Sequence, residues 1–266
     1  MNTTCIIGFD SAWTGKKGAI CALILGAGHE VDFKRPELAD FDEALAYVQT
    51  QTMLHDLCLV AVDQPTLVPN ETGCRPVDRV AAALVSYIGG GVQPANRGKA
   101  LLFGDRAPFW RFKERLDAQE CPEESRSSDR GLFLIEVFPA LALPALNPAF
   151  YGRLKGPKYN PANRLFRLQD WQSVTETVRR YAQISRLHSV EAWAREVGLI
   201  GSPRKADQDR LDSVLCALIG YHWRARPREQ SIMIGDLTFG YMVAPNNPEI
   251  RPRLEMASKK HRVPCM

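Results

Sequence analysis

The chain has 266 residues, of which 45% are apolar and 24% charged, the size and composition of one large globular domain or of one domain with an insertion. No apolar run approaches the ~18 residues that a membrane-spanning helix needs, and no basic segment precedes the first apolar run, so neither a membrane protein nor a signal peptide is expected. The seven cysteines are odd in number and lack Cys-x-x-Cys spacing, which argues against a disulfide framework or a zinc ribbon and favours reduced thiols in the cytosol.

The first predicted element is a strand over Thr4–Asp10, an apolar, β-rich run that ends in a carboxylate. The Gly, Ser and Lys content of the residues that follow is typical of a tight connection, so Asp10 lies where a buried strand emerges. A carboxylate there loses part of its hydration, which is costly unless a cation or hydrogen-bond donors replace the water. Asp10 therefore needs a partner.

The next elements give the order β-β-β-α-β. Ala19–Leu25 predicts a strand antiparallel to the first, and His29–Lys34 alternates like an edge strand. A capping box of Asp40 and Glu43 predicts the start of a helix, and Leu57–Asp63 is a further apolar run that ends in an acid. This order indicates a meander followed by a crossover to a parallel strand.

The rest of the chain is predicted to complete a single domain over residues 1–266, with an insertion at about 140–200 and a basic tail at about 245–266. The predicted elements are helices over Pro76–Gly89 and Pro108–Glu120, a polar loop over Gln119–Arg130, a strand over Gly131–Glu136, helices over Asp170–Gln183, Ser189–Val197 and 206–224, a hairpin of Ser231–Gly235 and Phe239–Val243, and a basic tail over Arg251–Arg262.

Three predicted strands end in acids, Asp10, Asp63 and Glu136. Gathered at one sheet edge, these carboxylates would repel one another unless protons or divalent metals neutralised them. In the helix over 206–224, Asp212 shares the apolar stripe expected to face the sheet, and Asp209 lies one turn earlier on nearly the same face. Taken singly, each acid could also form a turn, cap a helix or interact with a helix dipole. For Asp207 we favour interaction with the helix dipole. Together they indicate a functional cluster.

Basic residues gather in two segments. Arg97–Arg115 holds six Lys or Arg against two acids, and Tyr151–Leu168 holds five and no acid, with aromatic residues interleaved. Cations and stacking rings suit a phosphate backbone with exposed bases, whereas a solvated loop with a few core-packing rings remains the alternative. The candidate substrate-binding residues in these segments are Arg97, Lys99, Lys155, Lys158 and Tyr159.

The order of elements, with a late helix carrying Asp-x-x-Asp, resembles the ribonuclease H-like fold, and more narrowly its branch of RuvC-type Holliday-junction resolvases. The chain resembles most the DUF429 family, described as predicted ribonuclease H-like nucleases, from about Cys5 to Pro245. The elements that carry this resemblance are Gly8-Phe9-Asp10, Val62-Asp63-Gln64-Pro65, Arg75-Pro76-Val77-Asp78-Arg79, Ile135-Glu136-Val137-Phe138-Pro139, Asp209-Arg210-Leu211-Asp212-Ser213, and Gly235-Asp236 leading to Gly240.

The resemblance implies an α/β, ribonuclease H-like mixed five-stranded sheet flanked by helices, with a helical insertion and a C-terminal hairpin. It also implies that Asp10, Asp63 and Asp212 are metal carboxylates, with Asp209 as a further ligand or a supporting acid. Glu136 matches a Glu-x-x-Pro element that could bind metal, position water or orient a basic side chain.

Arg75 and Asp78 match an Arg-x-x-Asp element of the same family. Its role is open between contact of Arg75 with substrate and simple pairing of the two side chains.

Oxygen ligands without clustered histidine favour Mg²⁺ or Mn²⁺, and two such ions are expected. The predicted function is a metal-dependent nuclease acting on nucleic-acid phosphodiesters by a two-metal carboxylate mechanism. An ATPase or phosphotransferase of the actin and sugar-kinase type, to which Thr14-Gly15-Lys16 fits loosely, and a non-catalytic nucleic-acid-binding protein remain alternatives. The sequence does not distinguish RNA from DNA as substrate, single strands from duplexes or junctions, or endonuclease from exonuclease cleavage. It also leaves open whether the substrate is a small phosphorylated metabolite and whether the protein is a monomer or a homodimer.

Overall fold

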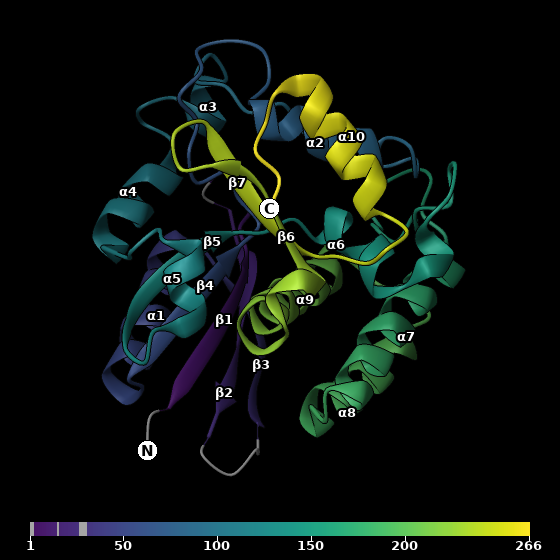
Figure 1. Ribbon diagram of the computed structural model, residues 1–266. Helices are drawn as coiled ribbons and strands as arrows, with labels where there is room; N and C mark the ends of the chain where they lie inside the picture. Colours follow the sequence, from purple (N-terminus) through teal and green to yellow (C-terminus); the bar gives the residue numbers. More distant parts are fainter. Residues whose placement is uncertain (1–2, 15, 27–30) are drawn as a thin grey trace.

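The computed structural model describes residues 3–14, 16–26 and 31–266, and it is built around one mixed sheet (Figure 1). The five strands lie in the order β3-β2-β1-β4-β5. They are β1 (Thr4–Asp10), β2 (Gly18–Leu25), β3 (Val31–Ala39), β4 (Leu57–Val62) and β5 (Gly131–Glu136). The predicted fold class is confirmed: the chain is α/β, with a mixed five-stranded sheet flanked by helices and a hairpin near its C-terminus.

The first three strands form the predicted meander. β2 pairs antiparallel with both β1 and β3, whereas β4 runs parallel to β1 and to β5. β3 is an edge strand, as predicted, but it continues through Pro36 to Ala39. Proline is tolerated there because, on the outer side of an edge strand, the backbone N–H groups do not hydrogen-bond to another strand. His29 and Glu30, the first residues of the predicted strand, lie outside the described residues.

The helices that cover one face of the sheet are α1 (Phe41–Leu54) and α4 (Pro108–Leu116). The capping box predicted for α1 is confirmed, since Asp40 caps the first turn and the Glu43 carboxylate accepts a hydrogen bond from the Asp40 N–H at 2.9 Å. Aromatic rings from both helices pack on Phe9 of β1. The helix predicted to reach Glu120 ends earlier, because Asp117 adopts a left-handed φ of 50° and closes α4.

Helix α9 (Lys205–Ala225), predicted over 206–224, runs along the centre of the other face and is buried over most of its length. Beside it lie α7 (Leu168–Ile184) and α8 (His188–Gly198), which pack over β2 and β3 (Figure 1). Both helices were predicted, over Asp170–Gln183 and Ser189–Val197. The sheet is therefore the middle layer of three, and its carboxyl-terminal edge is where elements from all layers meet.

A further apolar core lies beyond the end of the sheet. It is formed by α2 (Pro76–Val85), α6 (Pro139–Leu146), the hairpin β6 (Ser231–Asp236) and β7 (Gly240–Pro245), and α10 (Arg251–His261). The residues predicted as a basic tail are thus an ordered helix, because Ile250, Leu254 and Ala257 give α10 a buried apolar stripe. The last residues pair with β6 through Met233 and Met266, whose backbone N–H groups donate to each other's carbonyl oxygens at 2.9 Å.

The polar loop predicted over Gln119–Arg130 contains a short helix, α5 (Pro122–Ser127). The indole Nε1 of Trp223 on α9 donates to the Pro122 carbonyl oxygen at 2.8 Å and to Ser125 Oγ at 3.2 Å, so this segment is anchored on the core. The remaining short helices are α3 (Ala100–Phe103), η1 (Pro148–Phe150) and η2 (Arg228–Gln230).

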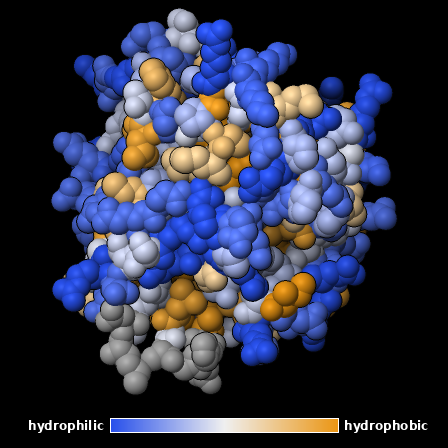
Figure 2. Space-filling view, viewed as in Figure 1, coloured by the Kyte–Doolittle hydropathy of each residue, from blue (hydrophilic) through white to orange (hydrophobic). Residues whose placement is uncertain are grey.

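Within the described ranges, no helix is long and apolar enough to span a membrane. Figure 2 shows a face of the molecule on which hydrophilic side chains predominate and apolar side chains form small separate patches.

His222 near the end of α9 is expected to make the fold sensitive to acid. Its Nε2 lies 2.9 Å from the Gln230 carbonyl oxygen and its Nδ1 lies 2.9 Å from the Tyr181 hydroxyl. Burial, with the nearby charges of Arg226 and Arg126, lowers the pKa of His222 from 6.5 to about 4. As pH falls, His222 is therefore protonated in the unfolded chain at a higher pH than in the folded protein. The free energy of unfolding is expected to decrease by about 3 kcal/mol between pH 6.5 and pH 4 because of this one side chain.

The measurement is urea unfolding of the wild type and of His222→Gln at pH 7 and pH 4. Other groups titrate in this range in both proteins, so the quantity compared is the difference between their losses in free energy of unfolding. If the free energy of unfolding falls equally in the two proteins, protonation of His222 does not destabilise the fold.

Candidate functional site

Three acids lie at the carboxyl-terminal edge of the sheet, as the parallel strands predict. Phe9 pairs with Val62, and Val62 pairs with Glu136, so β1, β4 and β5 end at the same level. The Asp63 N–H donates to the Phe9 carbonyl oxygen at 3.0 Å, which fixes Asp63 beside the end of β1. Asp10 is 8% exposed, Glu136 is 1% exposed, and Asp63 is partly buried.

Helix α9 reaches this edge because small residues let it approach β1 closely. An added Cβ at Gly8 would lie 2.0 Å from the Ser213 carbonyl oxygen, and one at Gly220 would lie 2.9 Å from Ile6 Cγ2. The backbones of the helix and the strand are therefore in contact at Gly8, two residues before Asp10. This contact brings the buried face of α9, with Asp209 and Asp212, to the end of the strand.

The carboxylates of Asp10 and Asp63 are placed at high electrostatic cost. Burial, followed by the charges of Asp212 and Asp63, raises the pKa of Asp10 well above its usual value. Burial, followed by the charges of Asp212 and Glu136, raises the pKa of Asp63 in the same way. Across the part of the chain that the structure describes, no donor hydrogen-bonds to either carboxylate. These two acids need positive charge or protons to be stable together.

Asp212 is held by neutral donors. The Tyr159 hydroxyl donates to Asp212 Oδ1 at 2.7 Å, and the Gln208 side-chain amide donates to Asp212 Oδ2. Burial raises the pKa of Asp212 to about 6, opposed by the hydrogen bond from Tyr159. Burial and the charge of Asp212 raise the pKa of Tyr159 well above 10, so its hydroxyl stays a donor. Tyr159 therefore connects the basic Tyr151–Leu168 segment to the acidic cluster, by which we mean Asp10, Asp63, Asp209 and Asp212.

Lys205 supplies positive charge at the same place. Its ammonium group pairs with Asp209 one turn further along α9. Burial lowers the pKa of Lys205, but the hydrogen bond to Asp209 and the charges of Asp10 and Asp212 raise it overall. The ammonium group is thus a built-in counter-ion for part of the acidic cluster. Asp207 has a different role, because its carboxylate accepts from the Arg204 N–H at 2.8 Å and caps the helix.

The acidic cluster has the right chemistry for a hard divalent cation, but its side chains are not arranged around one. Among the described residues, no three His, Cys, Asp or Glu side chains converge closely enough to hold an ion. Asp10 and Asp63 offer carboxylate oxygens without donors, whereas the oxygens of Asp212 and Asp209 are held by Tyr159, Gln208 and Lys205. The donor set suits Mg²⁺ or Mn²⁺, and an ion that uses all four acids requires rotation of Asp209 and Asp212.

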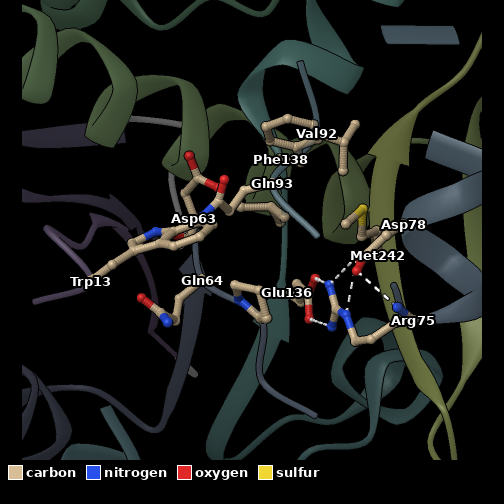
Figure 3. Close-up of a pocket in the computed structure, with 12 residues that line it drawn as sticks. Trp13, Asp63, Gln64, Arg75, Asp78, Val92, Gln93, Glu136, Phe138 and Met242 are labelled. Carbon is tan, nitrogen blue, oxygen red and sulfur yellow. Dashed lines mark hydrogen bonds and ion pairs between the residues drawn. The ribbon is translucent and has the colours of Figure 1, made fainter. Parts of the chain in front are cut away.

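Glu136 and Asp78 hold Arg75 in a buried ion network (Figure 3). Arg75 is 0% exposed, and its five N–H groups have acceptors on Asp78, Glu136 and the Leu67 carbonyl, at 2.6–3.1 Å. Of the two roles left open for Arg75, the structure shows pairing, and it leaves no N–H free for a substrate. Glu136 accordingly orients a basic side chain, while its charge still contributes to the raised pKa of Asp63.

The other candidate substrate-binding cations lie in loops and mostly have intramolecular partners. Arg97 pairs with Asp105, and the Lys99 ammonium donates to the Pro94 carbonyl oxygen at 2.7 Å. The Lys158 ammonium donates to the Gly89 carbonyl oxygen, and Lys155 is exposed. Of the candidates in the two basic segments, the structure brings only Tyr159 into contact with a predicted metal carboxylate.

Several side chains at the site were not selected from the sequence. They are Trp13, Gln64, Lys205 and Gln208. Gln64 directly follows Asp63, and Lys205 and Gln208 each lie four residues before an acid of α9. That helical spacing places a donor beside an acceptor, and it is a sequence signal that could have indicated both donors. No comparable signal marks Trp13.

Comparison with known families places the chain in one of them. The model of the family described as "Protein of unknown function (DUF429)" matches residues 8–233, which is most of the chain, so the chain belongs to that family. Neither the curated proteins nor the solved structures compared with the chain include a significant match.

Proposed function

From the geometry of its acidic cluster, we propose that this DUF429 protein is a metal-dependent nuclease that hydrolyses phosphodiester bonds of nucleic acid. The observation that carries the proposal is the pair Asp10 and Asp63, two neighbouring carboxylates at a sheet edge without hydrogen-bond donors among the described residues. Unused buried carboxylates are costly, and a divalent cation removes that cost. The β-β-β-α-β order and the acids on α9 agree with the ribonuclease H-like arrangement that the sequence resembles.

Asp10, Asp63 and Asp212 would hold the metal, with Asp209 as a further ligand. Bound Mg²⁺ or Mn²⁺, two ions in the mechanism we propose, lowers the pKa of an attacking water and offsets the charge on the leaving oxygen. The acids are on two β-strand ends and one helix, so the fold fixes their backbone positions, while the side chains of Asp209 and Asp212 would still rotate to reach an ion. Fixed backbone positions limit the rearrangement that works against electrostatic stabilisation of a transition state.

Three further side chains would control the charge and the orientation of the cluster. Lys205 offsets part of the negative charge, which lowers the repulsion that an anionic phosphodiester meets. Tyr159 and Gln208 hold Asp212 in one orientation in the absence of metal, and Lys205 holds Asp209, so both carboxylates would change their partners when metal binds. We assign these three residues positioning roles.

The partner we propose is nucleic acid, and the location the cytosol. The exposed Lys155 and the neighbouring basic residues of Tyr151–Leu168 lie on the segment that Tyr159 ties to the site, so a phosphate backbone could follow it. All seven cysteines are free thiols, as a reducing compartment requires.

The test is a cleavage panel in Mn²⁺ with single-stranded, duplex, hybrid and junction substrates, comparing the wild type with Asp10→Asn. Asp10→Asn keeps the size of the side chain and removes its charge, so we expect cleavage to fall at least about a hundredfold. Asp207→Asn is the matched control, because Asp207 caps α9 and does not belong to the acidic cluster. Its rate should stay close to that of the wild type.

Equal cleavage by the wild type and Asp10→Asn would show that the activity comes from a contaminant. ATP hydrolysis without cleavage would favour the phosphotransferase alternative instead. Tight binding that needs no metal and leads to no cleavage would favour a binding protein.

A further inference from the structure

The acidic cluster has two halves that differ in how their oxygens are held. In the strand-end half, Asp10 and Asp63 have no hydrogen-bond donor among the described residues. In the helix half, the carboxylates of Asp209 and Asp212 are both held by side-chain donors. A cation can therefore approach the strand-end half without breaking a contact, whereas at the helix half it must replace a donor that is already bound.

Lys205 is the charged donor of the helix half. Its ammonium group pairs with Asp209, and its charge opposes the effect of burial on the pKa of the other three acids. The donors to Asp212 are neutral, so Lys205 is the side chain that acts on the cluster as a cation. The Lys205 side chain is 52% exposed, so its ammonium group can turn out into solvent without disturbing the packing of α9.

The position of Lys205 is distinct from that of a cation between the two strand ends. After burial, the charge of Asp209 is among the causes that raise the pKa of Asp10, but it is not among those that raise the pKa of Asp63. Asp10 is thus the acid that both halves share. A cation beside Asp209 lies at a second position, and the ammonium group that pairs with Asp209 is found there.

We propose that Lys205 holds the second of the two cation positions until a second divalent ion displaces its ammonium group. The inference rests on the proposed nuclease function and concerns the regulation of the same site. Asp10 and Asp63 bind the first ion while Lys205 stays in place, and the second ion binds only when Lys205 releases Asp209. The ammonium group weakens the second position because it repels a divalent ion and competes for the same oxygen. The concentration of the second ion then sets the fraction of active protein.

The test is a titration with Mn²⁺ followed by electron paramagnetic resonance, which measures the free ion and needs no substrate. For the wild type we expect two classes of bound ion, the second at least about tenfold weaker than the first. Lys205→Met keeps much of the side chain and removes its charge, so the second class should become at least about tenfold tighter while the first changes less. Lys205→Arg keeps the charge and should bind Mn²⁺ as the wild type does.

Arg210→Met is the matched control. It removes one positive charge from the same helix, but Arg210 pairs with Asp207, which lies outside the acidic cluster. Both Mn²⁺ affinities should stay close to those of the wild type, because an exposed charge is screened by solvent and salt. In Lys205→Met, but not in Arg210→Met, the Mn²⁺ concentration that half-saturates cleavage should fall by the same factor as the second dissociation constant.

A second class that is seen only in Lys205→Met would also support the inference. A second class that does not become tighter in Lys205→Met, a wild type that binds two ions equally well, or an equal shift of both classes would overturn it. The nuclease proposal would survive each of these results, provided that Asp10→Asn weakens Mn²⁺ binding. If Asp10→Asn binds Mn²⁺ as the wild type does, or neither protein binds it, the metal site is wrong and both proposals fail.

Discussion

Gly8→Ala is expected to destabilise the protein by about 3 kcal/mol and to abolish the proposed metal-dependent cleavage. An added Cβ would lie 2.0 Å from the Ser213 carbonyl oxygen and 2.4 Å from the Ala217 N. Both atoms belong to the backbone of α9, so no side-chain rotation can relieve the overlap. The helix must move away from β1, and Asp212 moves with it.

The effect on activity follows from the position of this contact. Gly8 lies two residues before Asp10, and Ser213 directly follows Asp212. A displacement of the helix therefore separates Asp10 from Asp212, the two carboxylates that we propose share a metal ion. Removing the side chain of Ala217 as well is not expected to rescue the fold, because the two shortest contacts are with backbone atoms.

Thermal and urea unfolding measure the first effect, and Mn²⁺-dependent cleavage measures the second. Gly201→Ala is the matched control, because an added Cβ there has no heavy atom within 4 Å. Gly201→Ala should keep both stability and activity. A Gly8→Ala protein with wild-type stability would mean that α9 and β1 do not approach as closely as the structure describes.

The fold and the acids at the strand ends could be predicted because they depend on local patterns. Thr4–Asp10, Leu57–Asp63 and Gly131–Glu136 are apolar runs of strand length, and parallel strands bring their carboxyl ends to one edge. The buried stripe of α9 likewise follows from helical spacing. These features need no knowledge of distant contacts.

The partners of those acids could not be predicted in the same way. Tyr159 reaches Asp212 across 53 residues of sequence, and a count of basic residues indicated the segment but not the contact. The Arg-x-x-Asp element left Arg75 open between contact with substrate and pairing with Asp78. Burial decides between the two, and the burial of Arg75 depends on Glu136, 61 residues away. The helix over Arg251–His261 could not be predicted from the sequence for the same reason, since its apolar positions are buried against α2, which is distant in the chain.

Arg75→Met is expected to destabilise the protein by about 3–5 kcal/mol. Methionine fills much of the space but leaves Asp78 and Glu136, at 2% and 1% exposure, without their shared cation. Arg75→Lys should be almost as damaging, because one ammonium group cannot replace a planar guanidinium that reaches both carboxylates and the Leu67 carbonyl.

A double variant separates charge from packing. Arg75→Met combined with Glu136→Met replaces the main ion pair by apolar side chains, so it should be more stable than Arg75→Met alone, although Asp78 remains unpaired. Urea unfolding of the single and double variants gives the coupling free energy of Arg75 and Glu136. A stable Arg75→Lys protein that loses only substrate affinity would instead show that Arg75 is available to the substrate. The ion network of Arg75, Asp78 and Glu136 would then not be what stabilises this part of the site.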